Sequence, residues 1–294
     1  MHWRRGLAAC GLALLAGCSM PPRPAPVAET VPTVAAGRDA YTPASSSTPP
    51  IPAAPAAAPV AASAPAASTL GTQWGEGRES SVELVDATRI TPARPQALKT
   101  LHYTDEASIR SALGARADRQ LNVLLADGKV EWSLRDENDR PLPIYGARGE
   151  QGAHQVAGSR GARYELVYVN RSQRSYEVVA TVDGLDVLTG QGGSLRNNGY
   201  LLMPGETLRI EGFRKSSNEV AAFRFSGKDG AYASNTPAGN PRNIGVIGTA
   251  LFEVRLDKGP LQPPGGHPPR ADRPNAFPAD KPSPSPYAPA PQYR

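Results

Sequence analysis

Two clusters of acidic residues offer the side chains of this chain that could most readily do chemistry. The first, Asp136-Glu137-Asn138-Asp139, could supply oxygen ligands to Ca²⁺. It lacks the spaced ligands and the glycine of an EF-hand loop and lies between two arginines, which favours a solvated turn. The second cluster is Asp183 and Asp186, which flank a turn at a strand end. Paired carboxylates can perform acid–base hydrolysis if they converge, but this spacing does not predict convergence.

Histidine and cysteine, the usual ligands of transition metals, are sparse. Three histidines follow the first 17 residues, His102, His154 and His267, and no two of them have metal-ligand spacing. The two cysteines, Cys10 and Cys18, both lie near the N-terminus. The chain also has no G-x-S-x-G nucleophile motif, no P-loop and no dinucleotide fingerprint. We therefore expect no enzyme activity, no cofactor and no metal.

Polar loops are the part of the sequence best suited to recognition. Residues 188–200 and 227–244 are rich in glycine and amide side chains, and the second loop adds tyrosine and arginine. This composition suits binding loops on a rigid scaffold. The candidate partner-binding residues all lie in the second loop: Tyr232, Asn235, Arg242 and Asn243.

Arginines outside these loops give weaker indications of a binding site. The glycine-rich residues 146–161 predict a flexible basic loop, in which Arg148 and Arg160, with the adjacent Arg163, could bind an anion. Arg214-Lys215 follows a predicted strand, and we interpret this pair as a solvated strand end.

The elements that must position these loops are mostly strands, because apolar and polar residues alternate along the middle of the chain. Residues 121–134 give the clearest β-hairpin, since Asp127-Gly128 is a two-residue type I′ turn signal. Such a turn places three apolar pairs on one face of the hairpin, and these pairs are Leu125 with Val130, Val123 with Trp132, and Leu121 with Leu134. We therefore expect Trp132 in the core.

Further strands are predicted over residues 163–168, 176–182, 207–213, 221–225 and 246–256. Pro204-Gly205 predicts a type II turn before the third of these. In the last strand five apolar residues, from Val246 to Leu256, share one face with Gly248. That glycine indicates a bulge or a close backbone approach.

One short helix is expected over residues 105–113. Thr104 can cap it, Asp105 and Glu106 suit its positive end, and Gly114 can close it. Many short strands with turn signals predict an all-β fold, an antiparallel β-sandwich that is immunoglobulin-like or a jelly-roll.

Proline is concentrated in two blocks that flank this β-rich region. Of the 31 prolines, twelve fall in residues 19–70 and twelve in residues 259–294. Such segments bury too little apolar surface to offset their ordering entropy. We therefore expect a disordered tether over residues 18–70, one sandwich domain over residues 71–258 and a disordered tail over residues 259–294. The domain has 24 lysines and arginines against 23 acidic residues, too even a balance to indicate nucleic acid binding.

The N-terminus has the pattern of an export signal. Arg4-Arg5 precedes an apolar run that is too short to cross a bilayer about 30 Å thick, so residues 1–17 are interpreted as a signal peptide. Leu15-Ala16-Gly17-Cys18 resembles the lipobox of bacterial lipoproteins. The resemblance implies a lipid on the thiol of Cys18, and Ser19 in place of aspartate implies the outer membrane.

A second resemblance concerns the domain itself. Residues 163–188, with Val182-Asp183-Gly184-Leu185-Asp186-Val187, resemble a domain of uncharacterised proteobacterial envelope proteins. The likeness implies no activity. We expect a lipid-anchored envelope protein whose sandwich is a non-catalytic interaction or structural module with an envelope-protein or cell-wall partner. A glycan- or small-ligand-binding jelly-roll and an enzyme with an unrecognised site remain as alternatives.

Overall fold

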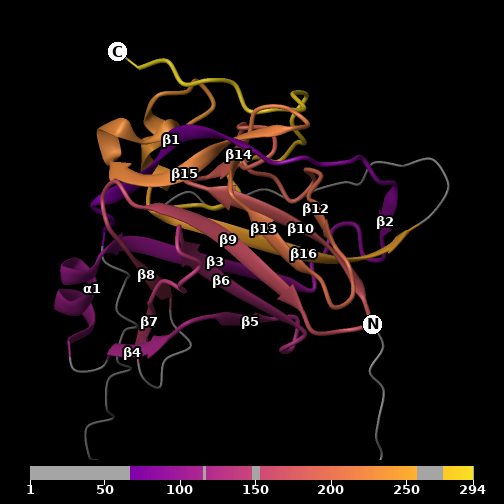
Figure 1. Ribbon diagram of the computed structural model, residues 1–294, viewed down its shortest axis with the longest axis horizontal. Helices are drawn as coiled ribbons and strands as arrows, with labels where there is room; N and C mark the ends of the chain where they lie inside the picture. Colours follow the sequence, from indigo (N-terminus) through magenta and orange to yellow (C-terminus); the bar gives the residue numbers. More distant parts are fainter. Residues whose placement is uncertain (1–66, 115–116, 148–152, 257–273, 294) are drawn as a thin grey trace, which may run out of the picture. The chain divides into compact units, whose positions relative to one another are not determined.

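The computed structural model describes residues 67–114, 117–147, 153–256 and 274–293. These residues form sixteen strands in two sheets, with one α-helix and three 3-10 turns (Figure 1). The seven-stranded sheet has the order β1-β15-β9-β6-β5, with β13 beside β9 and β14 beside β15. Its strands are β1 (Leu70–Glu79), β5 (Val123–Leu125), β6 (Val130–Asp136), β9 (Arg163–Asn170), β13 (Thr207–Ile210), β14 (Gly212–Arg214) and β15 (Glu219–Gly227).

The nine-stranded sheet has the order β11-β10-β16-β3-β8-β7-β4, with β12 beside β10 and β2 beside β16. One strand pair, β3 with β8, is parallel, and the other described pairs are antiparallel. The two sheets confirm the predicted all-β sandwich. The strands are β2 (Ala87–Arg89), β3 (Ala97–Asp105), β4 (Ala117–Gln120), β7 (Ile144–Ala147), β8 (His154–Gly158), β10 (Ser175–Val182), β11 (Leu185–Asp186), β12 (Tyr200–Leu202) and β16 (Val246–Leu256).

One large apolar core lies between the sheets. The seven-stranded sheet contributes Trp132 and Tyr168, whose rings stack with centroids 5.9 Å apart. The nine-stranded sheet contributes Val178 and Leu251, which are directly opposite each other on β10 and β16. All four side chains are buried, so the predicted core position of Trp132 is confirmed.

The predicted hairpin forms with the expected turn. Leu125 pairs with Val130, and Val123 pairs with Trp132. Asp127 and Gly128 have φ angles of 57° and 82°, as a type I′ turn requires. The third predicted pair is wrong, because Leu121 precedes β5 and is 46% exposed. The hairpin therefore has a shorter ladder than the alternation of apolar residues suggested.

The turn at Pro204-Gly205 also forms. Gly205 has a φ of 73°, and the Glu206 amide donates to the Met203 carbonyl at 3.1 Å, as in a type II turn. The strand that follows was predicted as one element, but it changes partner at Glu211. Its first half, β13, pairs with β9, whereas its second half, β14, pairs with β15.

The helix α1 (Glu106–Leu113) begins one residue later than predicted. Its N-cap is Asp105, whose carboxylate accepts a hydrogen bond from the Ser108 amide at 2.8 Å. The prediction of Thr104 as the cap is wrong, since Thr104 is buried and its hydroxyl accepts from the Thr69 amide at 3.0 Å. Gly114 closes the helix with a φ of 53°, as expected.

Two different elements cover the outer face of the nine-stranded sheet. Ile109 and Leu113 of α1 pack on Tyr145 of β7. Farther along the sheet, Phe277 packs against a cluster that includes Ala250 and Phe252 of β16. The apolar face predicted for the last strand is therefore this outer face, and residues 274–293 help to cover it.

Several predictions concern residues that the structure does not describe. They are the signal peptide, Cys18, the tether up to residue 66, and residues 259–273 of the expected tail. Among the described residues, no helix is long and apolar enough to span a bilayer.

Candidate functional site

Asp183 occupies a tight turn between β10 and β11. Its φ is 53°, and that of Gly184 is 75°, because a two-residue turn joins Val182 to its partner Leu185. The side chain is 1% exposed. Its carboxylate accepts hydrogen bonds from the Thr72 amide at 2.9 Å, the Gly245 amide at 2.9 Å and the Tyr103 hydroxyl at 2.6 Å. The donors come from β1, from β3 and from the residue that precedes β16, so Asp183 joins both sheets.

A chain of hydroxyl groups extends from this carboxylate into the core. The Thr72 hydroxyl lies 2.9 Å from that of Tyr103 and 2.6 Å from that of Tyr164. Burial raises the pKa of Asp183 to about 6, although its three hydrogen bonds act in the opposite direction. Burial also raises the pKa of both tyrosines well above the usual value. Every member of the group is closed off from solvent, which suits a structural network rather than a reaction site.

Asp186, the second carboxylate of the predicted pair, is also buried and hydrogen-bonded within the fold. It is 1% exposed, and one oxygen accepts from the Leu188 amide at 3.1 Å and from the Thr189 amide and hydroxyl at 2.9 and 3.0 Å. Burial raises its pKa. Asp186 thus shapes the start of the loop over residues 188–200, and the two carboxylates open onto no described pocket.

The acidic cluster at residues 136–139 forms a charged turn. Asp136 accepts from the amides of Asn138 and Arg140 at 2.9 and 2.8 Å, and Asp139 pairs with Arg209 at 2.7 Å. Within the described residues no three His, Cys, Asp or Glu side chains gather as a metal site would require.

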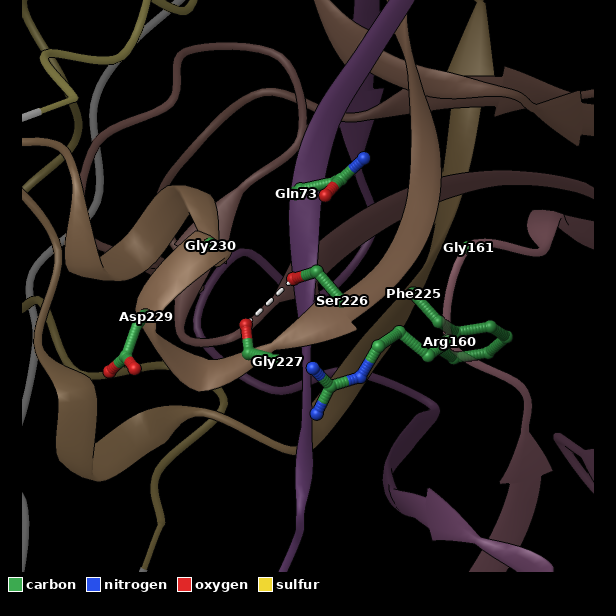
Figure 2. Close-up of a pocket in the computed structure, with 8 residues that line it drawn as sticks. All are labelled: Gln73, Arg160, Gly161, Phe225, Ser226, Gly227, Asp229 and Gly230. Atoms are coloured by element: carbon green, nitrogen blue, oxygen red, sulfur yellow. Dashed lines mark hydrogen bonds between the residues drawn. The ribbon is translucent and has the colours of Figure 1, made fainter.

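A shallow pocket of about 310 Å³ lies beside η2 (Lys228–Gly230). Figure 2 shows Arg160 and Asp229 on opposite sides of Gly227, with Gln73 on β1 and Ser226 on β15. The volume is at the lower end of the range of about 300–1,000 Å³ for ligand sites. Of the three arginines proposed for anion binding, Arg160 lines this pocket, Arg163 lies 3.8 Å from Glu76, and Arg148 is outside the described residues.

Arg214 is buried, so its interpretation as a solvated strand end is wrong. Its side chain is 2% exposed, and its guanidinium donates to the Tyr200 hydroxyl at 3.1 and 3.2 Å and to the carbonyl and hydroxyl oxygens of Ser80. A buried cation is tolerated when its donors are satisfied in this way. Lys215, by contrast, pairs with Glu219 near the surface.

The four candidate partner-binding residues differ in their surroundings. Tyr232 is fully buried, and its hydroxyl donates to the Pro289 carbonyl at 2.6 Å. Asn243 is 6% exposed, and its side-chain oxygen accepts from the Asn275 amide at 2.9 Å. Asn235 bonds to the carbonyls of Asp229 and Ala231 through its side chain, and its own carbonyl accepts from the Gln292 amide. Only Arg242 of the four is exposed.

Three of these residues therefore contact one segment of the same chain, residues 274–293, which we call the C-terminal segment. In Figure 1 it is the yellow trace beside the orange turns that follow β15. This segment was expected to be disordered, but it lies against the sandwich, with Ala276 and Ala288 buried. It also reaches the other candidate loop, where the Ala279 amide donates to the Gly193 carbonyl at 2.7 Å and the Ser283 amide to Asn197 at 3.1 Å.

No family model matches this chain, and neither a curated protein nor a solved structure matches it. The site is therefore interpreted from its own residues.

Glycines make the close approach of the C-terminal segment possible. A Cβ atom on Gly193 would lie 2.8 Å from the Ala276 carbonyl oxygen, and one on Gly190 would lie 2.6 Å from Cβ of Ala288. A Cβ on Gly248 would collide with the side chains of Ala276, Thr181 and Phe277, so the close approach at Gly248 is made by side chains and not by the predicted backbone. The register of β16 runs through this residue without a bulge.

We call the residues that receive this segment the tail-contact surface. It unites the two polar loops that composition singled out. The sequence signal for it was the glycine content of residues 188–200, but the occupant could not be recognised because proline-rich segments lack the alternation of a strand. The tail-contact surface consists of Gly184, Gly190, Gly192, Gly193, Asn197, Arg214, Tyr232, Asn235, Asn243 and Gly248.

Proposed function

We propose that this protein is a lipid-anchored component of the bacterial outer membrane, and that its β-sandwich is a non-catalytic interaction module for an envelope partner. The observation that carries the proposal is the tail-contact surface, which holds a peptide segment from outside both sheets through backbone hydrogen bonds. A surface of this kind recognises a chain without any group of shifted pKa. The lipobox at Cys18 supports the location.

The buried carboxylates support a non-catalytic role. The carboxylates of Asp183 and Asp186 accept hydrogen bonds from backbone amides and hydroxyl groups of the fold. A general acid or base needs a reacting proton within hydrogen-bond reach, and these side chains are closed off from solvent.

The charge pattern of the seven-stranded sheet argues against a nucleic acid partner. Arg78 and Arg224 are half-buried there and are paired with acids, Arg78 with Glu211 at 2.9 Å and Arg224 with Glu76 at 2.8 Å. Paired charges weaken the attraction of a face for phosphate groups.

The pocket beside η2 favours the alternative function, recognition of a small polar ligand. Arg160 and Asp229 offer charges of both signs there, and Gln73 and Ser226 offer hydrogen bonds. Saturable binding of a small envelope glycan, lost in Arg160→Ala, would favour this alternative over peptide recognition.

The lipid anchor leads to a first prediction. Cys18→Ala should abolish incorporation of a clickable fatty acid, because the substitution removes the only thiol that the lipobox would present. Cys10→Ala is the matched control, since Cys10 lies within the expected signal peptide, and it should be labelled like the wild type. Labelling of Cys18→Ala at the wild-type level would contradict lipidation at this residue.

The interaction module leads to a second prediction, tested with a photo-crosslinking residue in intact cells. At Arg242, which is exposed beside the tail-contact surface, the probe should yield a discrete adduct with an envelope protein or wall fragment. At Asp127, which is exposed in the distant β5–β6 turn, it should not. Mass spectrometry identifies the adduct. The same adducts from both positions, or none from Arg242, would count against this face as the site of interaction.

A further inference from the structure

The C-terminal segment is held mainly by its backbone. Five of its amides donate to the sandwich, and the Pro289 carbonyl accepts from Tyr232. Because the main chain makes these contacts, they depend on the path of the segment more than on its side chains. The five donors and their acceptors are Asn275 to Asn243, Ala279 to Gly193, Ser283 to Asn197, Ala288 to Arg214, and Gln292 to Asn235.

Four of these five donors come directly after a proline. The pairs are Pro274-Asn275, Pro278-Ala279, Pro282-Ser283 and Pro291-Gln292. Proline has no N–H group and fixes its φ near −65°, so it cannot donate itself and the next amide is the donor. The hydrogen bonds within the segment run through side chains, as from the Phe277 amide to Asn275 at 2.9 Å and from the Ser285 amide to Ser283 at 3.0 Å. The five amides that follow the path of the segment therefore remain available to the sandwich.

Small side chains complete the fit. Ala276 lies over Gly248 and Gly193, and Ala288 lies over Gly190. Both alanines are buried, and their atoms occupy the space that a Cβ on Gly190 or Gly248 would need. Phe277 adds one aromatic contact to the cluster around Phe252.

We propose that the tail-contact surface is a binding site for peptides built from proline–X dipeptides, and that the C-terminal segment occupies it as a displaceable ligand. The partner in trans is a proline- and alanine-rich segment of an envelope protein. This inference rests on the proposed function, because it names the ligand class of the same interaction module.

The C-terminal segment adds to the packing of the sandwich but lies outside both sheets. None of residues 274–293 belongs to a strand, and both sheets are complete between Leu70 and Leu256. Covalent attachment gives the segment a high effective concentration. A partner must therefore compete with the attached segment, so only a ligand that is present at high local concentration can occupy the site.

The test uses the full chain with a protease recognition sequence inserted within residues 259–273. After folding and cleavage, a fluorescent synthetic peptide of residues 274–293 is added. The cleaved protein should bind this peptide saturably as its own segment dissociates, whereas the uncleaved protein should bind it at least about tenfold more weakly because of intramolecular competition. Fluorescence anisotropy measures the binding, and circular dichroism follows the fold.

Peptide variants test the role of the proline–X amides. N-methylation at Ala279 removes the donor to Gly193 and should weaken binding about tenfold or more. N-methylation at Lys281, whose amide donates to no acceptor among the described residues, is the matched control and should change affinity little. Equal loss from both modifications would contradict recognition through these amides.

Protein variants test the surface itself. A Cβ on Gly192 would meet only Ala279, at 3.2 Å, so Gly192→Val should weaken peptide binding at least about tenfold and leave the sandwich folded. Gly230→Ala, which makes only ordinary contacts with Ser226 and Gln73, should bind like the wild type. Unchanged binding by Gly192→Val would overturn the placement of the site.

Two further outcomes would overturn the proposal outright. One is a cleaved protein that keeps its fold but never exchanges its segment. The other is a sandwich that unfolds when the segment leaves, which would make residues 274–293 part of the fold. Both are measured with purified protein, so they are independent of whether the probe at Arg242 captures a partner in cells.

Discussion

Trp132→Ala should lower the free energy of unfolding by about 3–5 kcal/mol, the usual cost of truncating a large buried aromatic residue. Trp132 is fully buried, lies opposite Val123 in the hairpin and stacks on Tyr168 with an angle of 6° between the rings. Alanine would leave a cavity between two sheets whose backbones cannot close over it. Denaturant titration of the wild type and the variant measures the difference.

Leu124→Ala provides the matched control. Leu124 is the residue after Val123 on the same strand, but its side chain is on the opposite face and is 58% exposed. Its truncation should change stability by no more than about 0.5 kcal/mol. Similar losses of unfolding free energy in both variants would mean that the substitutions weaken the hairpin itself rather than the packing of the core.

The second large effect is the dependence of stability on pH through Asp183. Its pKa is about 6 in the folded protein against a usual value of 3.8, so the folded state holds this proton more tightly than the unfolded state. The resulting stabilisation is fully present below about pH 3.8 and is lost as pH rises through about 6. The difference between the two pKa values corresponds to about 3 kcal/mol.

Asp183→Asn should remove this contribution. Asparagine tolerates the positive φ of this turn, but its amide group would face the Thr72 amide, so two donors would meet. We therefore expect the variant to be less stable than the wild type, with a deficit that shrinks by about 3 kcal/mol between pH 4 and pH 7. Denaturant unfolding at a series of pH values measures this deficit.

Asp136→Asn is the control for the direction of the effect. Amide hydrogen bonds, chiefly from Arg140, lower the pKa of Asp136, so its contribution is present above the usual carboxyl pKa and lost as pH falls. The deficit of Asp136→Asn should therefore shrink toward low pH, opposite to that of Asp183→Asn. A deficit of Asp183→Asn that is constant with pH would rule out a raised pKa for that carboxyl group.

The sequence predicted those parts of the fold that depend on local patterns. Asp127-Gly128 and the alternation around it specify a hairpin register without help from the rest of the chain, and the structure has that register. The type II turn at Pro204-Gly205 was predicted correctly for the same reason. The helix cap was misplaced by one residue because Thr104 and Asp105 are both good caps, and only the tertiary contacts decide that the Thr104 side chain is buried while the Asp105 carboxylate reaches the Ser108 amide.

The candidate site was predicted less completely because it depends on distant residues. Arg214 looks like a surface residue in the sequence, and nothing there shows that Ser80 and Tyr200 converge on it. The composition of their loop predicts Tyr232 and Asn243 as partner-binding residues, and in the structure both contact residues 274–293. Composition singled out the two loops, but it could not reveal that a proline-rich segment of the same chain would join them.

The position of β16 has a consequence for the order in which the protein folds. The last strand of the sandwich lies between β10 and β3, in the middle of the nine-stranded sheet. In the other sheet the first strand, β1, pairs with β15, so it cannot pair until β15 has been synthesised. Contacts between residues so far apart in sequence form slowly, since a long loop must close first. A chain that is still being synthesised therefore cannot complete either sheet. It stays without a finished core until nearly all of its residues are available, a property compatible with export in an unfolded state.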